Sequence, residues 1–216
     1  MNRREFSGQT ATLVALSALG LPGLAWAQKK PEEGKDYRRL DKPVAVLAAA
    51  GKIEVIEFFW YSCPHCNLFE PRLVEWIKKS PADVAVRRVP VAFRDDFVPQ
   101  QRLFYALEAI GKLEEMHSKV FEAIHVKKEP INREDLIVAW AEKNGLDKVK
   151  FQELYNSFSV STKSRRAAQL QDGFKVEGVP ALGIAGRYYT DGTMAGTMPR
   201  ALQVADHLIA EARKSR

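Results

Sequence analysis

Two apolar runs in the first half of the chain have the composition of buried strands. Residues 53–59 and 84–91 are rich in β-branched and aromatic side chains and lack the polar alternation of a half-exposed strand. Between them, apolar positions recur at helical spacing after residue 66, and Pro81 ends that pattern. This order predicts a strand, a helix and a second strand that lie in a sheet covered on both faces.

The middle of the chain, residues 97–173, has a different periodicity. Apolar side chains recur there at three- and four-residue spacing in several successive segments, which predicts an all-helical block. Asn132 and Asp147 are expected N-caps, and Asn144-Gly145 is a helix stop. The sequence therefore predicts helices placed inside an α/β chain.

The end of the chain returns to the α/β pattern. Residues 181–184 and 187–190 predict two strands, and Pro199 opens a last amphipathic helix. The expected parts are given by their residue ranges: a first α/β part at 28–96, an inserted helical domain at 97–173 and a second α/β part at 174–216.

The first residues predict an export signal. Arg3 and Arg4 precede a moderately apolar segment at 10–24, and residues 25–27 form a small-x-small cleavage pattern. We expect removal of residues 1–27, with an uncleaved anchor as the alternative. The arginine pair also resembles a twin-arginine motif, but the residues that follow depart from it, so the Sec and twin-arginine routes both stay open.

Composition restricts the class of protein. With 46% apolar and 28% charged residues in 216, the chain fits a soluble globular protein, and no run of about 20 uninterrupted apolar residues suggests a permanent membrane span. The net charge of +6 is spread over separate basic pairs with acids between them. Nucleic acid binding needs a continuous basic stripe, so we expect no nucleic acid partner.

Cys63 and Cys66 are the two cysteines of the chain, and they lie in one Cys-Pro-His-Cys run directly after the first predicted strand. So short a ring is a poor structural staple, worth only about 2 kcal/mol in the chain-entropy model. A helix that begins at Cys63, with Pro64 in its first turn, would place the sulfur beside free N–H groups, and His65 would add a hydrogen bond or a positive charge. These features favour the thiolate, which stabilises the reduced pair and predicts an oxidant that donates its disulfide.

Other uses of the cysteines remain as alternatives. Zinc would need two more ligands, and His117, His125 and His207 lie far along the chain without paired spacing, so we expect neither a metal nor a cofactor. His117 and His125 are interpreted as structural histidines. A thiol protease would need a histidine and an orienting amide around a single nucleophile, not a second cysteine three residues on, and an inert structural disulfide is a further alternative.

Four motifs combine in one order along the chain. They are Gly34-Lys35-Asp36-Tyr37 with Lys42-Pro43-Val44, Glu57-Phe58-Phe59, Cys63-Pro64-His65-Cys66, and Gly178-Val179-Pro180 followed by Ala181-Leu182. Together they resemble the DsbA family of bacterial thiol:disulfide oxidoreductases. The resemblance implies a thioredoxin fold with an inserted all-helical domain, a periplasmic location and a monomer. It also implies reduced exported proteins as substrates and reoxidation by a DsbB-type membrane protein linked to quinone.

The resemblance also implies roles for residues outside the cysteine run. It gives Val179-Pro180 a cis peptide bond, which would leave the Val179 backbone free to pair with an extended substrate; an ordinary loop proline is the alternative. It makes Glu57 the buried carboxylate that shuttles the proton of Cys66. The alternative for Glu57 is an edge position paired with Arg87 or Arg88.

The predicted activity is that of a dithiol oxidase for newly exported proteins. A disulfide isomerase or reductase of the same fold is the nearest alternative, although Pro64-His65 and the valine before Pro180 are oxidase-like in the family. A non-enzymatic substrate-binding chaperone is an alternative of another class. Trp60 and Tyr61 are expected either in an apolar substrate surface or packed against the helical block.

Overall fold

The computed structural model describes residues 29–215, so the predicted signal at 1–27 lies outside the described residues. Pro31–Arg216 form one compact unit. Within the described part of the chain, no helix is both long and apolar enough to cross a membrane.

A five-stranded mixed sheet forms the centre of this unit among the described residues. Its strands in spatial order are β1 (Arg38–Arg39), β5 (Tyr188–Asp191), β4 (Ala181–Ile184), β2 (Ile53–Phe59) and β3 (Val84–Pro90). β2 pairs in parallel with β3, whereas the other pairs are antiparallel. Every residue of β2 is buried, as its apolar run predicts for a strand with neighbours on both sides.

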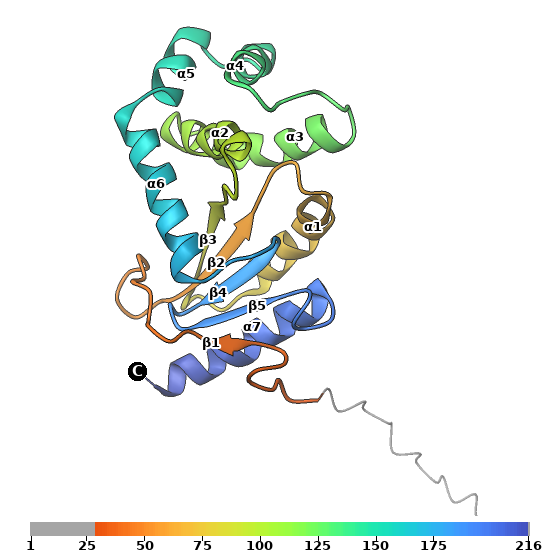
Figure 1. Ribbon diagram of the computed structural model, residues 1–216, viewed down its shortest axis with the longest axis vertical. Helices are drawn as coiled ribbons and strands as arrows, with labels where there is room; N and C mark the ends of the chain where they lie inside the picture. The colour runs from red at the N-terminus through yellow and green to blue at the C-terminus, as the bar shows by residue number, and fades with distance from the viewer. Residues whose placement is uncertain (1–28, 216) are drawn as a thin grey trace, which may run out of the picture. The chain divides into compact units, whose positions relative to one another are not determined.

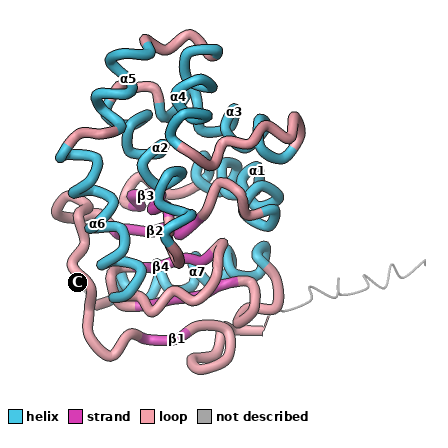
Figure 2. The backbone as a smooth tube through the Cα atoms, turned by 45° about the horizontal axis from the view of Figure 1, so that its top comes forward, coloured by secondary structure: helices cyan, strands magenta, loops and turns pink. Residues whose placement is uncertain are grey.

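Helices cover both faces of the sheet (Figures 1 and 2). On one face, α1 (Pro64–Lys79) and α7 (Met198–Lys214) share a core with the sheet that includes Leu73, Leu182 and Leu208. On the other face, Phe174 follows α6 (Phe158–Gly173) and its ring lies 5.3 Å from that of Phe58. A Cβ atom on Gly183 would meet the Phe174 ring at 2.5 Å, so this close approach requires glycine.

The helical block lies between β3 and β4 in the chain, as the periodicity predicts. Its elements are η1 (Asp95–Phe97), α2 (Val98–Ala109), α3 (Leu113–His125), α4 (Glu134–Lys143), α5 (Lys148–Tyr155) and α6. Figure 1 shows α2 to α5 gathered beyond one end of the sheet, and α6 leading back to it. The predicted domain boundaries themselves stay a prediction.

Some local expectations differ from the structure. The short strand β1 was not expected, because two arginines have no strand signature. The predicted N-cap at Asn132 is wrong: α4 takes Arg133 as its N-cap, and the amide of Asn132 donates instead to the carbonyl of Pro130. Asp147 does cap α5, since its side chain accepts a hydrogen bond of 2.8 Å from the Lys150 amide.

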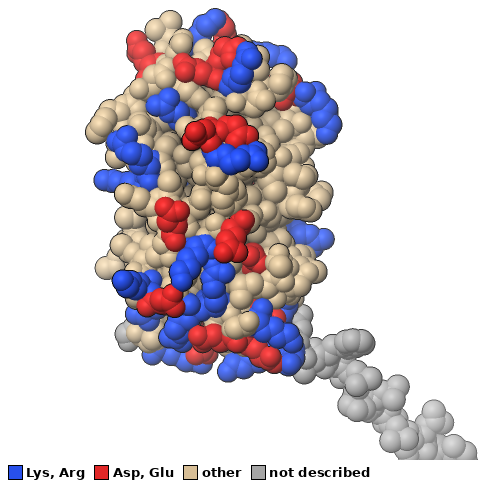
Figure 3. Space-filling view, viewed as in Figure 1, with Lys and Arg blue, Asp and Glu red and all other residues tan. Residues whose placement is uncertain are grey.

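The described surface carries acidic and basic side chains together. Figure 3 shows the two kinds interspersed on the face that it presents. Several form exposed pairs, such as Lys163 with Glu108 and Arg213 with Asp83. Such exposed pairs contribute little stability each, so the fold depends on its two apolar cores.

Candidate active site

The cysteine pair lies at the start of α1. Cys63 is the N-cap and Pro64 the first helical residue, and the Asn67 amide donates to the Cys63 carbonyl at 3.1 Å. No side chain caps this helix end, so the first N–H groups of the helix stay available to the Cys63 sulfur. Both thiols are free, and Cys66 is fully buried while Cys63 is 7% exposed. The structure therefore represents the reduced pair.

The two thiols have opposite acidities. A hydrogen bond from the Cys66 thiol, helped by the backbone N–H groups of Cys66 and His65 and by the His65 charge, outweighs burial and lowers the pKa of Cys63 to about 6. Burial raises the pKa of Cys66 well above its ordinary value, and the hydrogen bond to Cys63, the negative charge of Cys63 and, once it is ionised, that of Glu57 raise it further. At neutral pH the pair is therefore a Cys63 thiolate beside a Cys66 thiol.

A proline turn faces the reactive sulfur. The Val179-Pro180 peptide bond is cis, as the resemblance implies, and the Cys63 sulfur lies 3.4 Å from the Val179 carbonyl oxygen. A pocket of about 420 Å³ opens beside this turn, and its lining includes His65, Thr193 and Met198. Thr193 and Met198 carry no signal in the sequence, because only the fold brings the end of the chain to the cysteines.

Glu57 lies in the middle of the sheet, 1% exposed. Its Oε2 atom is 3.2 Å from Nε of Arg88, which stands directly opposite it in the parallel pairing of β2 with β3. Arg87 instead pairs with Glu54, at 3.1 Å from each carboxylate oxygen. The expectation that Glu57 lies at an edge position is therefore wrong, because β2 has neighbours on both sides. Of Arg87 and Arg88, the two arginines expected as partners of Glu57 in that case, Arg88 is the one that pairs with it.

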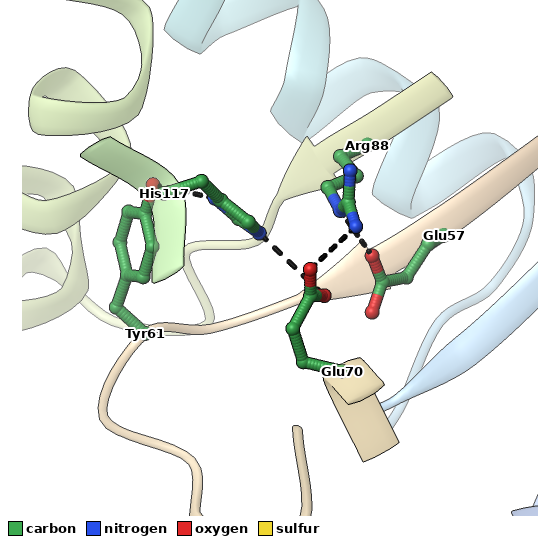
Figure 4. A network of polar contacts seen from close by, with 5 residues as sticks. All are labelled: Glu57, Tyr61, Glu70, Arg88 and His117. Atoms are coloured by element: carbon green, nitrogen blue, oxygen red, sulfur yellow. Dashed lines mark hydrogen bonds and ion pairs between the residues drawn. The ribbon is translucent and has the colours of Figure 1, made fainter. Parts of the chain in front are cut away.

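A second carboxylate competes for the same arginine. Arg88 donates from Nη2 to Oε1 of Glu70 at 2.6 Å (Figure 4). Burial raises the pKa of Glu57 to about 8, Glu70 acts in the same direction, and Arg88 opposes both. Glu57 is therefore a largely protonated carboxyl at neutral pH. The sequence contains one signal for Glu70: it lies four residues after Cys66, on the same face of α1.

Tyr61 joins the cysteine turn to the helical block. Its hydroxyl lies 2.9 Å from Nδ1 of His117, and its carbonyl lies 2.8 Å from Nε2 of His125, so both histidines have partners as expected. Trp60 stacks on Phe97 with ring centroids 3.8 Å apart. Tyr61 is 1% exposed, so the packing alternative describes it, whereas Trp60 packs on Phe97 but stays partly exposed.

Within residues 29–215, no three His, Cys, Asp or Glu side chains gather as they would around a metal ion. The site instead combines an acidic thiol that is 7% exposed with a fully buried thiol of raised pKa, beside a cis-proline turn. This arrangement favours thiol–disulfide exchange through Cys63, since the thiolate of lower pKa is the better leaving group. Fold and site thus define a thiol:disulfide oxidoreductase.

Comparisons with known proteins specify the class further. The family model for a DSBA-like thioredoxin domain matches residues 54–203. The chain is 42% identical to the thiol:disulfide interchange protein DsbA of Burkholderia cepacia over 91% of this chain and 93% of that protein. The crystal structure of Pseudomonas aeruginosa DsbA superposes with a TM-score of 0.81 and 38% identity, over 86% of this chain and 96% of that one.

The chain therefore belongs to the DsbA family. The predictions of a thioredoxin fold with a helical insertion and of an enzyme that acts as a dithiol oxidase are confirmed. The isomerase and chaperone alternatives have no such support among these relatives.

Proposed function

We propose that this oxidase donates the Cys63–Cys66 disulfide to reduced proteins newly exported to the periplasm. The single observation that carries the proposal is the acidity difference within the pair, with a pKa of about 6 for Cys63 and a strongly raised pKa for Cys66. The predicted signal at 1–27 supports the compartment, and the family supports exported proteins as the substrates. We also propose that the protein works as a monomer.

The exchange proceeds in two displacements. A substrate thiolate attacks the Cys63 sulfur, the Cys63–Cys66 bond breaks, and its electron pair passes to Cys66. The Glu57 carboxyl then gives its proton to the Cys66 thiolate, whose high pKa favours this transfer. A second substrate thiolate attacks the substrate sulfur of the mixed disulfide and expels Cys63 as a thiolate. The substrate leaves oxidised by two electrons, and the enzyme leaves as the dithiol.

The remaining site residues serve this exchange in the proposal. Val179 offers its backbone to an extended substrate, and Pro180 holds that backbone beside the Cys63 sulfur. Pro64 opens the helix at N1, while His65 is exposed and adds positive charge near Cys63. The contact with substrate is thus mainly to backbone, which suits substrates of varied sequence.

We further propose that a DsbB-type membrane protein linked to quinone returns the pair to the disulfide. Reoxidation reverses the proton transfer, so Cys66 gives its proton back to Glu57. The domain division at 28–96, 97–173 and 174–216 belongs to the same proposal, with the cysteines and Pro180 in the two α/β parts.

Disulfide transfer to a reduced, unfolded substrate tests the proposal. Oxidised protein mixed with such a substrate in equal amounts should oxidise it, and Cys63→Ser should abolish the transfer. Cys66→Ala cannot form the Cys63–Cys66 disulfide, so it should not oxidise the reduced substrate when no other oxidant is present. Disulfide transfer by Cys63→Ser at the wild-type rate would contradict the proposal, because it would mean that the cysteines take no part in the activity.

A further inference from the structure

The buried carboxylates beneath the cysteines are connected to the helical block through His117. This residue lies on α3 and is 5% exposed. Its Nε2 atom lies 3.6 Å from Oε2 of Glu70, and neither atom has a hydrogen-bond partner among the described residues. Figure 4 shows the polar contacts running from Tyr61 through His117, Glu70 and Arg88 to Glu57.

One tautomer of His117 fits both of its contacts, a hydrogen bond to Tyr61 and a longer 3.6 Å approach to Glu70. Burial raises the pKa of Tyr61 well above its ordinary value, so its hydroxyl keeps the proton and donates to Nδ1. Burial also lowers the pKa of His117, which leaves the ring neutral with its remaining proton on Nε2. That N–H faces the otherwise unpartnered Oε2 of Glu70.

The two buried carboxyl groups, Glu57 and Glu70, differ in how many groups stabilise their negative charge. Arg88 is the shared cation of Glu57 and Glu70, and Glu114 on α3 is the other acid that acts on His117. Burial would raise the pKa of Glu70, but its contacts with His117 and Arg88 hold that pKa below its usual range. Among residues 29–215, the ion pair of Glu57 is its 3.2 Å contact with Arg88, and its Oε2 atom has no hydrogen-bond partner there. Glu70 therefore takes the carboxylate form and Glu57 the protonated form.

We propose that His117 is a positioning residue of the redox reaction, because it holds Glu70 as a carboxylate. The charged Glu70 keeps Arg88 shared between two acids. Glu57 therefore stays protonated and can give its proton to Cys66. This inference rests on the proposed role of Glu57. If His117 has this role, a residue of the inserted helical block takes part in the chemistry of the cysteine pair, which lies in the α/β part of the chain.

Solvent offers a competing reason for the charge on Glu70. A pocket of about 280 Å³ is lined by residues that include Glu70, Arg88, Glu114 and His117, and Glu57 does not line it. Water in this pocket could hold the Glu70 charge without help from His117. The two explanations differ in what they expect when only the N–H donor toward Glu70 is removed.

Two amide variants separate them. His117→Asn keeps a polar group near Nδ1 but cannot reach Glu70, whereas His117→Gln can place an N–H near the position of Nε2. The reduction potential of the cysteine pair would be measured from pH 5 to pH 9 for both. In His117→Asn, the inflection that belongs to Glu57 should move down by about one pH unit, because a protonated Glu70 releases Arg88 to Glu57. His117→Gln should restore most of the wild-type profile.

A wild-type profile in a folded His117→Asn would overturn the inference and would favour solvent in the pocket. Glu57→Gln identifies the inflection: if it leaves the profile unchanged, the proposed role of Glu57 fails first. If Glu57→Gln removes the inflection and His117→Asn leaves it in place, only the inference fails. Should the amide variants unfold, His117→Phe keeps the ring volume without either nitrogen. A downward shift of the Glu57 inflection in this variant would support the inference, and an unchanged profile would overturn it.

Discussion

The acidity of Cys63 depends most on the thiol of its own redox partner. We expect the thiolate absorbance of the reduced protein near 240 nm to titrate with a midpoint of about 6. Cys66→Ala should move this midpoint upward, toward the ordinary value of about 8.5, since the hydrogen-bond donor is lost.

Cys66→Ser is the matched control for that titration, because its hydroxyl can still donate to the Cys63 sulfur. Its midpoint should stay below that of the alanine variant. Equal midpoints for wild type and Cys66→Ala would mean that the helix end and His65 alone set the acidity.

The buried Glu57 carboxyl makes the stability of the reduced protein depend on pH. Its pKa rises from 4.5 to about 8 on folding, so the stabilisation by its proton is complete below pH 4.5 and is lost as the pH rises toward 8. Relative to Glu57→Gln, wild type should lose about 1 kcal/mol of unfolding free energy per pH unit in this window. Urea unfolding at several pH values measures the difference.

Glu153→Gln is the control, because this exposed glutamate on α5 loses the same carboxylate without burial. It should follow wild type at each pH. A constant difference between wild type and Glu57→Gln from pH 5 to pH 8 would contradict a protonated Glu57.

At this scale the sequence identifies single residues better than their partners. Glu57 is conspicuous as an acid in an apolar strand, but the choice of Arg88 over Arg87 follows from the register of β2 with β3. His117 and Glu70 belong to different helices and meet only in the tertiary structure. No local pattern predicts such a contact.

Among the helices of the inserted block, α5 has a capping bond that can be tested alone. Asp147→Ala should lower the free energy of unfolding by about 1 kcal/mol, because the Lys150 amide loses its acceptor. Asp147→Asn should cost much less, since asparagine caps a helix about as well. Urea denaturation gives both values, and equal losses in the two variants would contradict a capping role.

Elements with strong periodicity or clear capping residues are predictable in this chain. The strand at 53–59 and the strand at 181–184 appear with the expected bounds. The strand β1 is not predictable, because its two residues pair with β5 through backbone groups and have no apolar pattern. Long-range pairing, rather than propensity, creates that element.

At the scale of the whole molecule, the helical block holds the turn that carries the cysteines. Gln100 on α2 donates to Ser62 at 2.7 Å and to the Ile131 carbonyl at 2.6 Å, and His125 contacts the Tyr61 carbonyl. The sequence predicts that a helical block is inserted. It does not predict these contacts, because the direction in which the block packs is set by the whole core.

The function of the whole molecule depends on an oxidising cysteine pair, because a thiolate stabilised at Cys63 stabilises the reduced protein. The most direct test equilibrates the protein with glutathione buffers and measures the reduction potential of the Cys63–Cys66 couple. We predict a value more positive than about −180 mV, in the range of disulfide donors. A value below about −250 mV, in the range of thioredoxin-like reductants, would contradict the account.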